Sequence, residues 1–131
     1  MFIRPIIVNI IFVLVLCGGC STGKNIVVDT SLSDAELIQR GQEAFDLNRY
    51  RQAIQHYTVV LERAAPYSES FFAAEYEIAF VYYKMKDYKA AQVKFKEILA
   101  NYGNTEAELY PAQYKILSLK LLESIEEKTK S

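Results

Sequence analysis

The chain has 131 residues, which is enough for one small domain. Its 15 basic and 16 acidic side chains nearly balance, the formal net charge is -1, and no run of lysines and arginines stands apart from acidic neighbours. Nucleic-acid binding is therefore not expected, because it requires a basic patch that displaces counterions from phosphates. The two cysteines, Cys17 and Cys20, both lie near the N-terminus, which excludes a disulfide framework.

The first 19 residues have the layout of an export signal. Arg4 supplies positive charge, and residues 6–16 (IIVNIIFVLVL) form an apolar core of the length expected for a signal peptide. This run is too short for a transmembrane helix, which needs roughly 20 apolar residues. The Cys17-x-x-Cys20 pair is disfavoured as a metal or redox motif, because no second cluster of cysteine or histidine completes it.

Small Gly18 and Gly19 stand directly before Cys20, and in this the segment resembles the signal of bacterial lipoproteins. The resemblance implies that residues 1–19 are a signal peptide and that the Cys20 sulfur is lipidated, with palmitate as the labelled acyl chain. It also implies a lipid-anchored protein of the bacterial cell envelope, on the periplasmic side or in the outer membrane. One position departs from the pattern, since Leu16 lies four residues before the cysteine and not three. A simple secretory signal and an uncleaved membrane segment remain alternatives.

Residues 20–32 are predicted to be the lipidated cysteine and a tether, because residues 21–32 show no helical period. A flexible stretch of about 12 residues spans ~20 Å by random-coil scaling. The alternative is that the apolar run 26–28 packs on the folded domain.

A first helical hairpin is predicted after the tether. Ser33-x-x-Glu36 is a capping-box pattern, so a helix is expected from there to about Leu47. A turn at residues 48–50 and a second helix ending at Pro66 follow. The residues expected to face inward share three- and four-residue spacing: Leu37, Ile38, Gly41, Ala44, Phe45, Ala53, Ile54, Tyr57, Val60 and Leu61.

A second hairpin with the same pattern comes next. Its inward residues are predicted to be Ile78, Ala79, Tyr82, Tyr83, Ala91, Phe95, Ile98 and Leu99, with a turn at residues 86–88. Residues 101–104 are expected to stop the fourth helix, with Gly103 taking the left-handed conformation that glycine tolerates.

The two hairpins repeat one another at an offset of 38 residues. Residues 47–61 align with residues 85–99, so that Tyr50 meets Tyr88, Tyr57 meets Phe95 and small Gly41 meets Ala79. This pattern resembles the tetratricopeptide repeat (TPR), although Arg40 and Glu75 depart from it and the repeat is longer than the usual 34 residues. The resemblance implies an all-α, TPR-like α-solenoid over residues 33–131.

The last segment is predicted to be a capping helix over residues 111–128. Tyr114, Leu117, Leu121 and Ile125 are expected on its inner side. Pro111 suits a first turn, and Thr105-x-x-Glu108 offers a competing start.

The residues show no pattern typical of an enzyme. His56, the single histidine, is expected to be solvated or partly packed, and no phosphate loop, serine elbow or metal cluster occurs in the sequence. We therefore expect neither catalysis nor a cofactor or metal.

What remains is a surface for partners. In TPR proteins the first helix of each hairpin lines a concave groove, and carrying this over residue by residue gives Ile38, Gln42, Phe45, Tyr76, Phe80, Tyr83 and Lys84. The resemblance thus implies a protein-interaction scaffold or adaptor that binds a protein or peptide. For Phe45 and Tyr83, the alternative is that they complete the core. Three other functions remain open: a structural subunit of a larger envelope assembly, for example one related to outer-membrane β-barrel assembly; a self-associating domain; and a small-ligand carrier.

Overall fold

The structure, a computed structural model, describes residues 25–130. The predicted signal peptide (residues 1–19) and Cys20 therefore lie outside the described residues. The described part is all-helical, and its helices are α1 (Asp34–Asp46), α2 (Tyr50–Arg63), α3 (Glu69–Lys84), α4 (Tyr88–Asn101) and α5 (Ala112–Thr129), with a short 3-10 helix η1 (Ala107–Leu109) before α5. None of these helices combines the length and the apolar character that crossing a bilayer requires.

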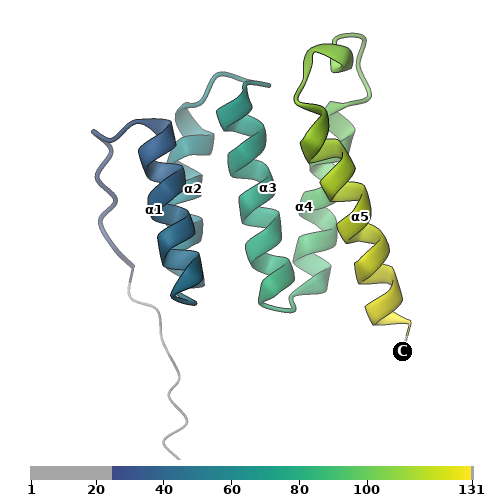
Figure 1. Cartoon of the computed structure of the whole chain (residues 1–131), viewed down its shortest axis with the longest axis horizontal. Helices are drawn as coiled ribbons and strands as arrows, with labels where there is room; N and C mark the ends of the chain where they lie inside the picture. Colours follow the sequence, from purple (N-terminus) through teal and green to yellow (C-terminus); the bar gives the residue numbers. More distant parts are fainter. Residues whose placement is uncertain (1–24, 131) are drawn as a thin grey trace, which may run out of the picture.

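The five helices form two layers. In Figure 1, α1, α3 and α5 lie side by side in front of α2 and α4. Consecutive helices pack against each other, and α3 also contacts both α1 and α5. The front layer thus consists of the first helix of each predicted hairpin together with α5.

The first hairpin begins where its capping residues predict. The Ser33 side chain accepts a hydrogen bond from the Glu36 backbone, and the Glu36 carboxylate accepts one from the Ser33 backbone at 2.8 Å. Because such reciprocal bonds satisfy the free N–H groups of a helix start, α1 begins at Asp34.

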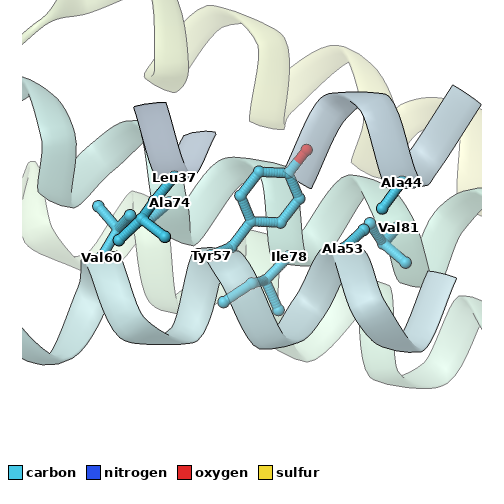
Figure 2. Close-up of a cluster of buried hydrophobic side chains, with 8 residues drawn as sticks. All are labelled: Leu37, Ala44, Ala53, Tyr57, Val60, Ala74, Ile78 and Val81. Carbon is cyan, nitrogen blue, oxygen red and sulfur yellow. The ribbon is translucent and has the colours of Figure 1, made fainter. Parts of the chain in front are cut away.

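Helices α1, α2 and α3 bury a common set of side chains, the first cluster. Its members are Leu37, Ala44, Ala53, Tyr57, Val60, Ala74, Ile78 and Val81. Figure 2 shows the Tyr57 ring at the middle of this cluster, next to Ile78. Gly41 permits the close approach of α1 to this ring, since a Cβ at Gly41 would lie only 2.3 Å from Tyr57 Cε1. The glycine is therefore needed for packing rather than for a turn.

The turns of the two hairpins have the same geometry. Asn48 and Lys86 both adopt a left-handed backbone, with φ of 57° and 62°. In the first turn the Arg49 N–H donates to the Ala44 carbonyl at 2.8 Å, and in the second the Asp87 N–H donates to the Tyr82 carbonyl at 3.0 Å. The helices that follow, α2 and α4, have 14 residues each. Residues 47–61 and 85–99 thus adopt matching structures.

A second cluster joins α3, α4 and α5. It comprises Phe72, Ala79, Ala91, Phe95, Ile98, Tyr102 and Ile125. Tyr114 and Leu121 pack against it as predicted, but the assignment of Leu117 to the inner side was wrong, because Leu117 is 38% exposed and the adjacent Ser118 is fully buried. Neighbouring helix positions differ by about 100° in direction, so the buried stripe of α5 passes through Ser118 and leaves Leu117 at its margin.

The end of α4 also differs from the expectation. The helix stops at Asn101 as predicted, but no glycine among residues 25–130 has a positive φ, so Gly103 does not act through a left-handed backbone. Instead, the N–H groups of Tyr102 and Gly103 donate to the carbonyls of Leu99 and Ala100, which tightens the last turn. After η1, Pro111 precedes α5 directly and forms its N-cap.

The segment before α1 lies along α2. The Ile26 backbone N–H donates to Gln55 Oε1 at 3.1 Å, and Val28 and Leu32 pack against the first cluster. Near the other end of α2, the Arg63 guanidinium donates to the Thr30 carbonyl at 2.9 Å. Ile26 and Val28 thus contact the domain, as the alternative for the tether region proposed. Val27, which lies between them, is fully exposed.

Candidate interaction surface

Four aromatic side chains form a continuous row on the α1 and α3 surface, which we call the aromatic row: Phe45, Tyr76, Phe80 and Tyr83. Phe80 lies at its centre, with ring centroids 5.6 Å from Phe45, 6.0 Å from Tyr76 and 6.1 Å from Tyr83. All four side chains are partly exposed. The structure thus brings together four of the seven residues that the sequence analysis assigned to a groove.

The outer members of the row are also attached to the core. Phe45 packs against the first cluster and Tyr83 against the second. The Tyr83 hydroxyl also lies 3.0 Å from the Ser124 hydroxyl on α5. The alternative that these two residues complete the core is therefore supported, and both side chains also remain partly exposed.

Tyr76 connects the row to α4 and α5. Its ring centroid lies 6.0 Å from that of Phe95 and 5.8 Å from that of Tyr114. Burial raises the pKa of Tyr76 to about 12, so its phenol is neutral at physiological pH. Tyr76 therefore contributes an uncharged ring to the row.

The remaining three predicted residues flank the row in different ways. Ile38 packs against the first cluster. Gln42 is exposed and donates from Nε2 to Glu77 Oε1 at 3.4 Å, while Lys84 is exposed at the last residue of α3. Burial raises the pKa of Glu77, and the Gln42 hydrogen bond partly opposes this rise. Gln42, Glu77 and Lys84 thus supply polar groups on the helices that carry the row, whereas Ile38 belongs to the core.

Two contributors were missed by the sequence analysis. Tyr114 was assigned only to the inner side of α5, yet its hydroxyl donates to Glu69 Oε1 at 2.9 Å and its ring extends the row through Tyr76. Glu77 was not assigned at all, because its role depends on the neighbouring helix α1 bringing Gln42 within reach. The helical period alone carries no signal for either contact.

A hollow of about 320 Å³ lies away from the aromatic row. It is open to solvent, and its lining residues come from α3 and α4: Tyr82, Lys89, Ala90, Val93 and Lys94. Two of these lining residues are lysines, of which Lys94 is paired with Glu97 at 2.8 Å, and none of them belongs to the predicted groove set. The hollow is therefore not the predicted groove.

His56 and the acidic residues of the described part are candidate reactive groups. His56 is partly buried, its Nδ1 atom has no hydrogen-bond partner, and burial lowers its pKa. No three residues of the histidine, cysteine, aspartate or glutamate type between residues 25 and 130 are placed to hold a metal ion.

Comparison with known proteins identifies a relative in Treponema pallidum. No family model matches the chain, and no solved structure matches it significantly. The chain is similar to an uncharacterised protein of Treponema pallidum (strain Nichols), with 29% identity over 120 residues. The match covers 91% of this chain and 48% of the relative, so the chain spans about half the length of the curated relative that it matches.

Proposed function

We propose that this protein is a lipid-anchored scaffold of the bacterial cell envelope and that it binds a protein or peptide partner through the aromatic row. In this proposal the helices are TPR-type repeats, and Cys20 carries the lipid. The observation that carries the proposal is Phe80, a partly exposed ring held between Phe45, Tyr76 and Tyr83. Aromatic side chains offer large contact areas with little loss of rotamer freedom, and they are enriched in binding hot spots.

The equivalent positions of the two hairpins support a TPR-type arrangement. Ala53 and Ala91 are both fully buried, as are Tyr57 and Phe95, and the two turns have the same hydrogen bonds. The contacts of α3 with both α1 and α5 place first helices next to one another, as stacking of such repeats requires.

Crosslinking in cells tests the binding surface. Phe80→Ala should lower the recovery of a specific crosslinked partner about tenfold or more, because truncation of a hot-spot aromatic costs about 2 kcal/mol or more. We prefer Phe80 to Tyr76 for this test, since Tyr76 also contacts Phe95 in the second cluster.

Val93→Ala is the matched control. Val93 is 52% exposed on α4 and lines the hollow described above. The proposal predicts that Val93→Ala recovers the partner as well as the parent does. Equal recovery by Phe80→Ala and the parent would refute the aromatic row as the site, whereas selective loss with Val93→Ala would move the site to the hollow.

The anchor has a separate test. Cys20→Ala should abolish labelling of the chain by radioactive palmitate, because the variant lacks the sulfur that would carry the lipid. A variant with Cys17→Ala should still be labelled. Labelling that persists in Cys20→Ala would exclude Cys20 as the acylated residue.

A further inference from the structure

The two ends of the helical array differ in charge. One end, which we call the turn end, consists of residues 46–51, 84–89 and 126–130, where α1, α3 and α5 finish and α2 and α4 begin. It carries seven basic and four acidic side chains. The opposite end, residues 29–36, 62–69 and 101–115, carries seven acidic and two basic side chains. The near-neutral net charge of the chain thus hides a strong separation of charge along the helices.

The turn end also exposes two apolar tips. Leu47 is 60% exposed and Met85 is 48% exposed, and they occupy equivalent positions in the two turns. The basic side chains next to them in the turns are all exposed: Arg49, Arg51, Lys84, Lys86 and Lys89. Apolar tips surrounded by cations are the combination that suits the interface of an anionic bilayer.

Arg49 is unusual for its position. In the second turn the equivalent residue, Asp87, caps α4 by accepting a hydrogen bond from the Ala90 N–H at 3.1 Å. In the first turn Arg49 occupies the N-cap of α2 and makes no side-chain cap bond. Since a capping aspartate is worth about 1 kcal/mol, the first turn carries a positive charge at a position where a negative one would stabilise the helix.

The chain leaves the described structure close to the turn end. Ile26 is held by Gln55, five residues into α2, which is about 7.5 Å along the helix from its first residue. From there the segment runs toward Arg63 and the acidic end. Figure 1 shows this segment alongside α1, with its first residues toward the end at which the C-terminus lies. Four residues separate Cys20 from Asn25, so the five Cα–Cα steps between them span at most about 18 Å when fully extended.

From these observations we infer that the turn end rests on the anionic lipid headgroups of the membrane that holds Cys20, with Leu47 and Met85 inserted at the interface. This inference rests on the proposed anchor at Cys20. The short segment between Cys20 and Asn25 keeps the turn end near the bilayer. The cations of the turn end are attracted to anionic lipid, and the acidic end is repelled from that lipid. The aromatic row, which runs along α1 and α3, then stands beside the membrane and is open to a partner.

Single cysteines test the orientation. The full chain is expressed in bacteria, purified and reconstituted into vesicles of phosphatidylcholine with a minority of phosphatidylglycerol. Leu47→Cys and Met85→Cys report on the turn end, and Leu109→Cys, which replaces a side chain 83% exposed near Glu106 and Glu108, reports on the acidic end. The rate of reaction with a polymer-linked maleimide is compared between vesicles and detergent.

We expect the two turn-end cysteines to react about tenfold more slowly on these vesicles than in detergent, and the cysteine at position 109 to react equally in both. High salt, or vesicles of phosphatidylcholine alone, should remove most of this protection, because the attraction to anionic lipid is screened or absent. Equal reaction rates at both ends would overturn the inference. The same rates can be measured in membranes isolated from the cells, and protection of the turn end there that is absent from the purified vesicles would also overturn it. The second of these results would indicate a protein on the turn end.

Charge variants provide the matched comparison. Lys86→Glu with Lys89→Glu should restore fast reaction at positions 47 and 85, whereas Lys96→Glu with Lys120→Glu, an equal charge change at exposed positions outside the turn end, should not. If both pairs restored it equally, only net charge would matter and the orientation would be refuted.

The parent chain separates failure of the anchor from failure of the orientation. With lipid on Cys20 and Cys17 removed with the signal, the parent should not react with maleimide, and mass spectrometry should find acyl chains on Cys20. A parent that reacts at Cys17 or Cys20 would refute the proposed anchor. The reaction rates of the cysteines at positions 47, 85 and 109, each followed on its own peptide by mass spectrometry, would still decide which end faces the bilayer.

Discussion

The two helical hairpins share a backbone plan but differ in chemistry at three places, which are the core, the turn and the start of the repeated pattern. In the core, the first hairpin pairs Gly41 with Tyr57, whereas the second has Ala79 and Phe95 at those positions. At the turn, Arg49 stands where the second hairpin has Asp87. The comparison shows that one fold tolerates a smaller residue with a larger ring, or a larger residue with a smaller ring, when the sum of their volumes is kept.

A third difference lies at the start of the pattern. Leu37 of α1 is fully buried, while the equivalent Glu75 of α3 is partly buried and accepts a hydrogen bond from Asn101 Nδ2 at 3.0 Å. Leu37 needs only apolar neighbours, but Glu75 needs a partner from α4. The second hairpin therefore depends on polar contacts where the first depends on apolar burial.

The largest effect is expected from adding a methyl group at Gly41. Gly41→Ala should lower the free energy of unfolding by about 2 to 3 kcal/mol, since overpacking against the Tyr57 ring outweighs the ~1 kcal/mol that alanine adds to helix stability. Urea denaturation measures this change. Gly103→Ala is the control, because a Cβ there meets only the Ala100 carbonyl oxygen at 3.3 Å.

A double-mutant cycle sharpens this prediction. If the clash with the ring is the cause, Gly41→Ala should be much less harmful when Tyr57→Leu removes the ring, so the two effects should not add. Additive effects would show that Gly41 is required for a reason other than the approach to Tyr57.

The next effect concerns the hydroxyl that distinguishes the two core rings. The Tyr57 side chain is fully buried, its hydroxyl has no hydrogen-bond partner, and burial raises its pKa above the ordinary range. Tyr57→Phe, which copies Phe95, should raise the free energy of unfolding by about 1 to 2 kcal/mol, because an unpaired buried hydroxyl is costly. Phe95→Tyr should have the opposite sign. Thermal unfolding in which Tyr57→Phe is destabilised would reveal a partner for that hydroxyl.

Much of the fold followed from the sequence because its signals are local. The Ser33 and Glu36 capping box, the repeated turns and the helical spacing of Leu37, Gly41 and Ala44 each involve residues within one or two helical turns. Such patterns determine where a helix begins and which of its faces is apolar. They therefore predicted the two hairpins and most of the two clusters.

The parts that were not predicted depend on what covers each face. Leu117 and Ser118 are neighbours, and the way α5 packs against α3 and α4 decides which of the two is buried. Likewise, the row formed by Phe45 and Phe80 was anticipated as a set of residues, but its contact with Tyr114 required α5 to be placed. Helical period gives the direction of a side chain and not the neighbour that it meets.

A smaller effect is expected at the caps of α2 and α4. Arg49→Asp should supply the cap that α2 lacks and raise the free energy of unfolding by about 1 kcal/mol, while Asp87→Ala should remove the existing cap and lower it by a similar amount. Chemical denaturation of both variants measures the pair. The comparison fails if Arg49→Asp is no more stable than Arg49→Ala, since the alanine lacks a capping oxygen.

The smallest effect, and the one most dependent on pH, is expected at Glu75. Burial, followed by the charge of Glu97, raises the pKa of this carboxyl in the folded chain. The folded state then holds the proton more tightly than the unfolded state, so stability is greatest below the unfolded pKa and falls as pH rises through the folded pKa.

Glu75→Gln tests this, because the glutamine keeps an oxygen that can accept the Asn101 hydrogen bond but cannot ionise. Its stability should match the parent in acid, where Glu75 is protonated, and exceed it at neutral pH. The exposed Glu62→Gln on α2 is the control and should show no such divergence. A parallel pH dependence of the parent and Glu75→Gln would mean that Asn101 and the nearby Lys94 compensate fully for the burial of this carboxylate.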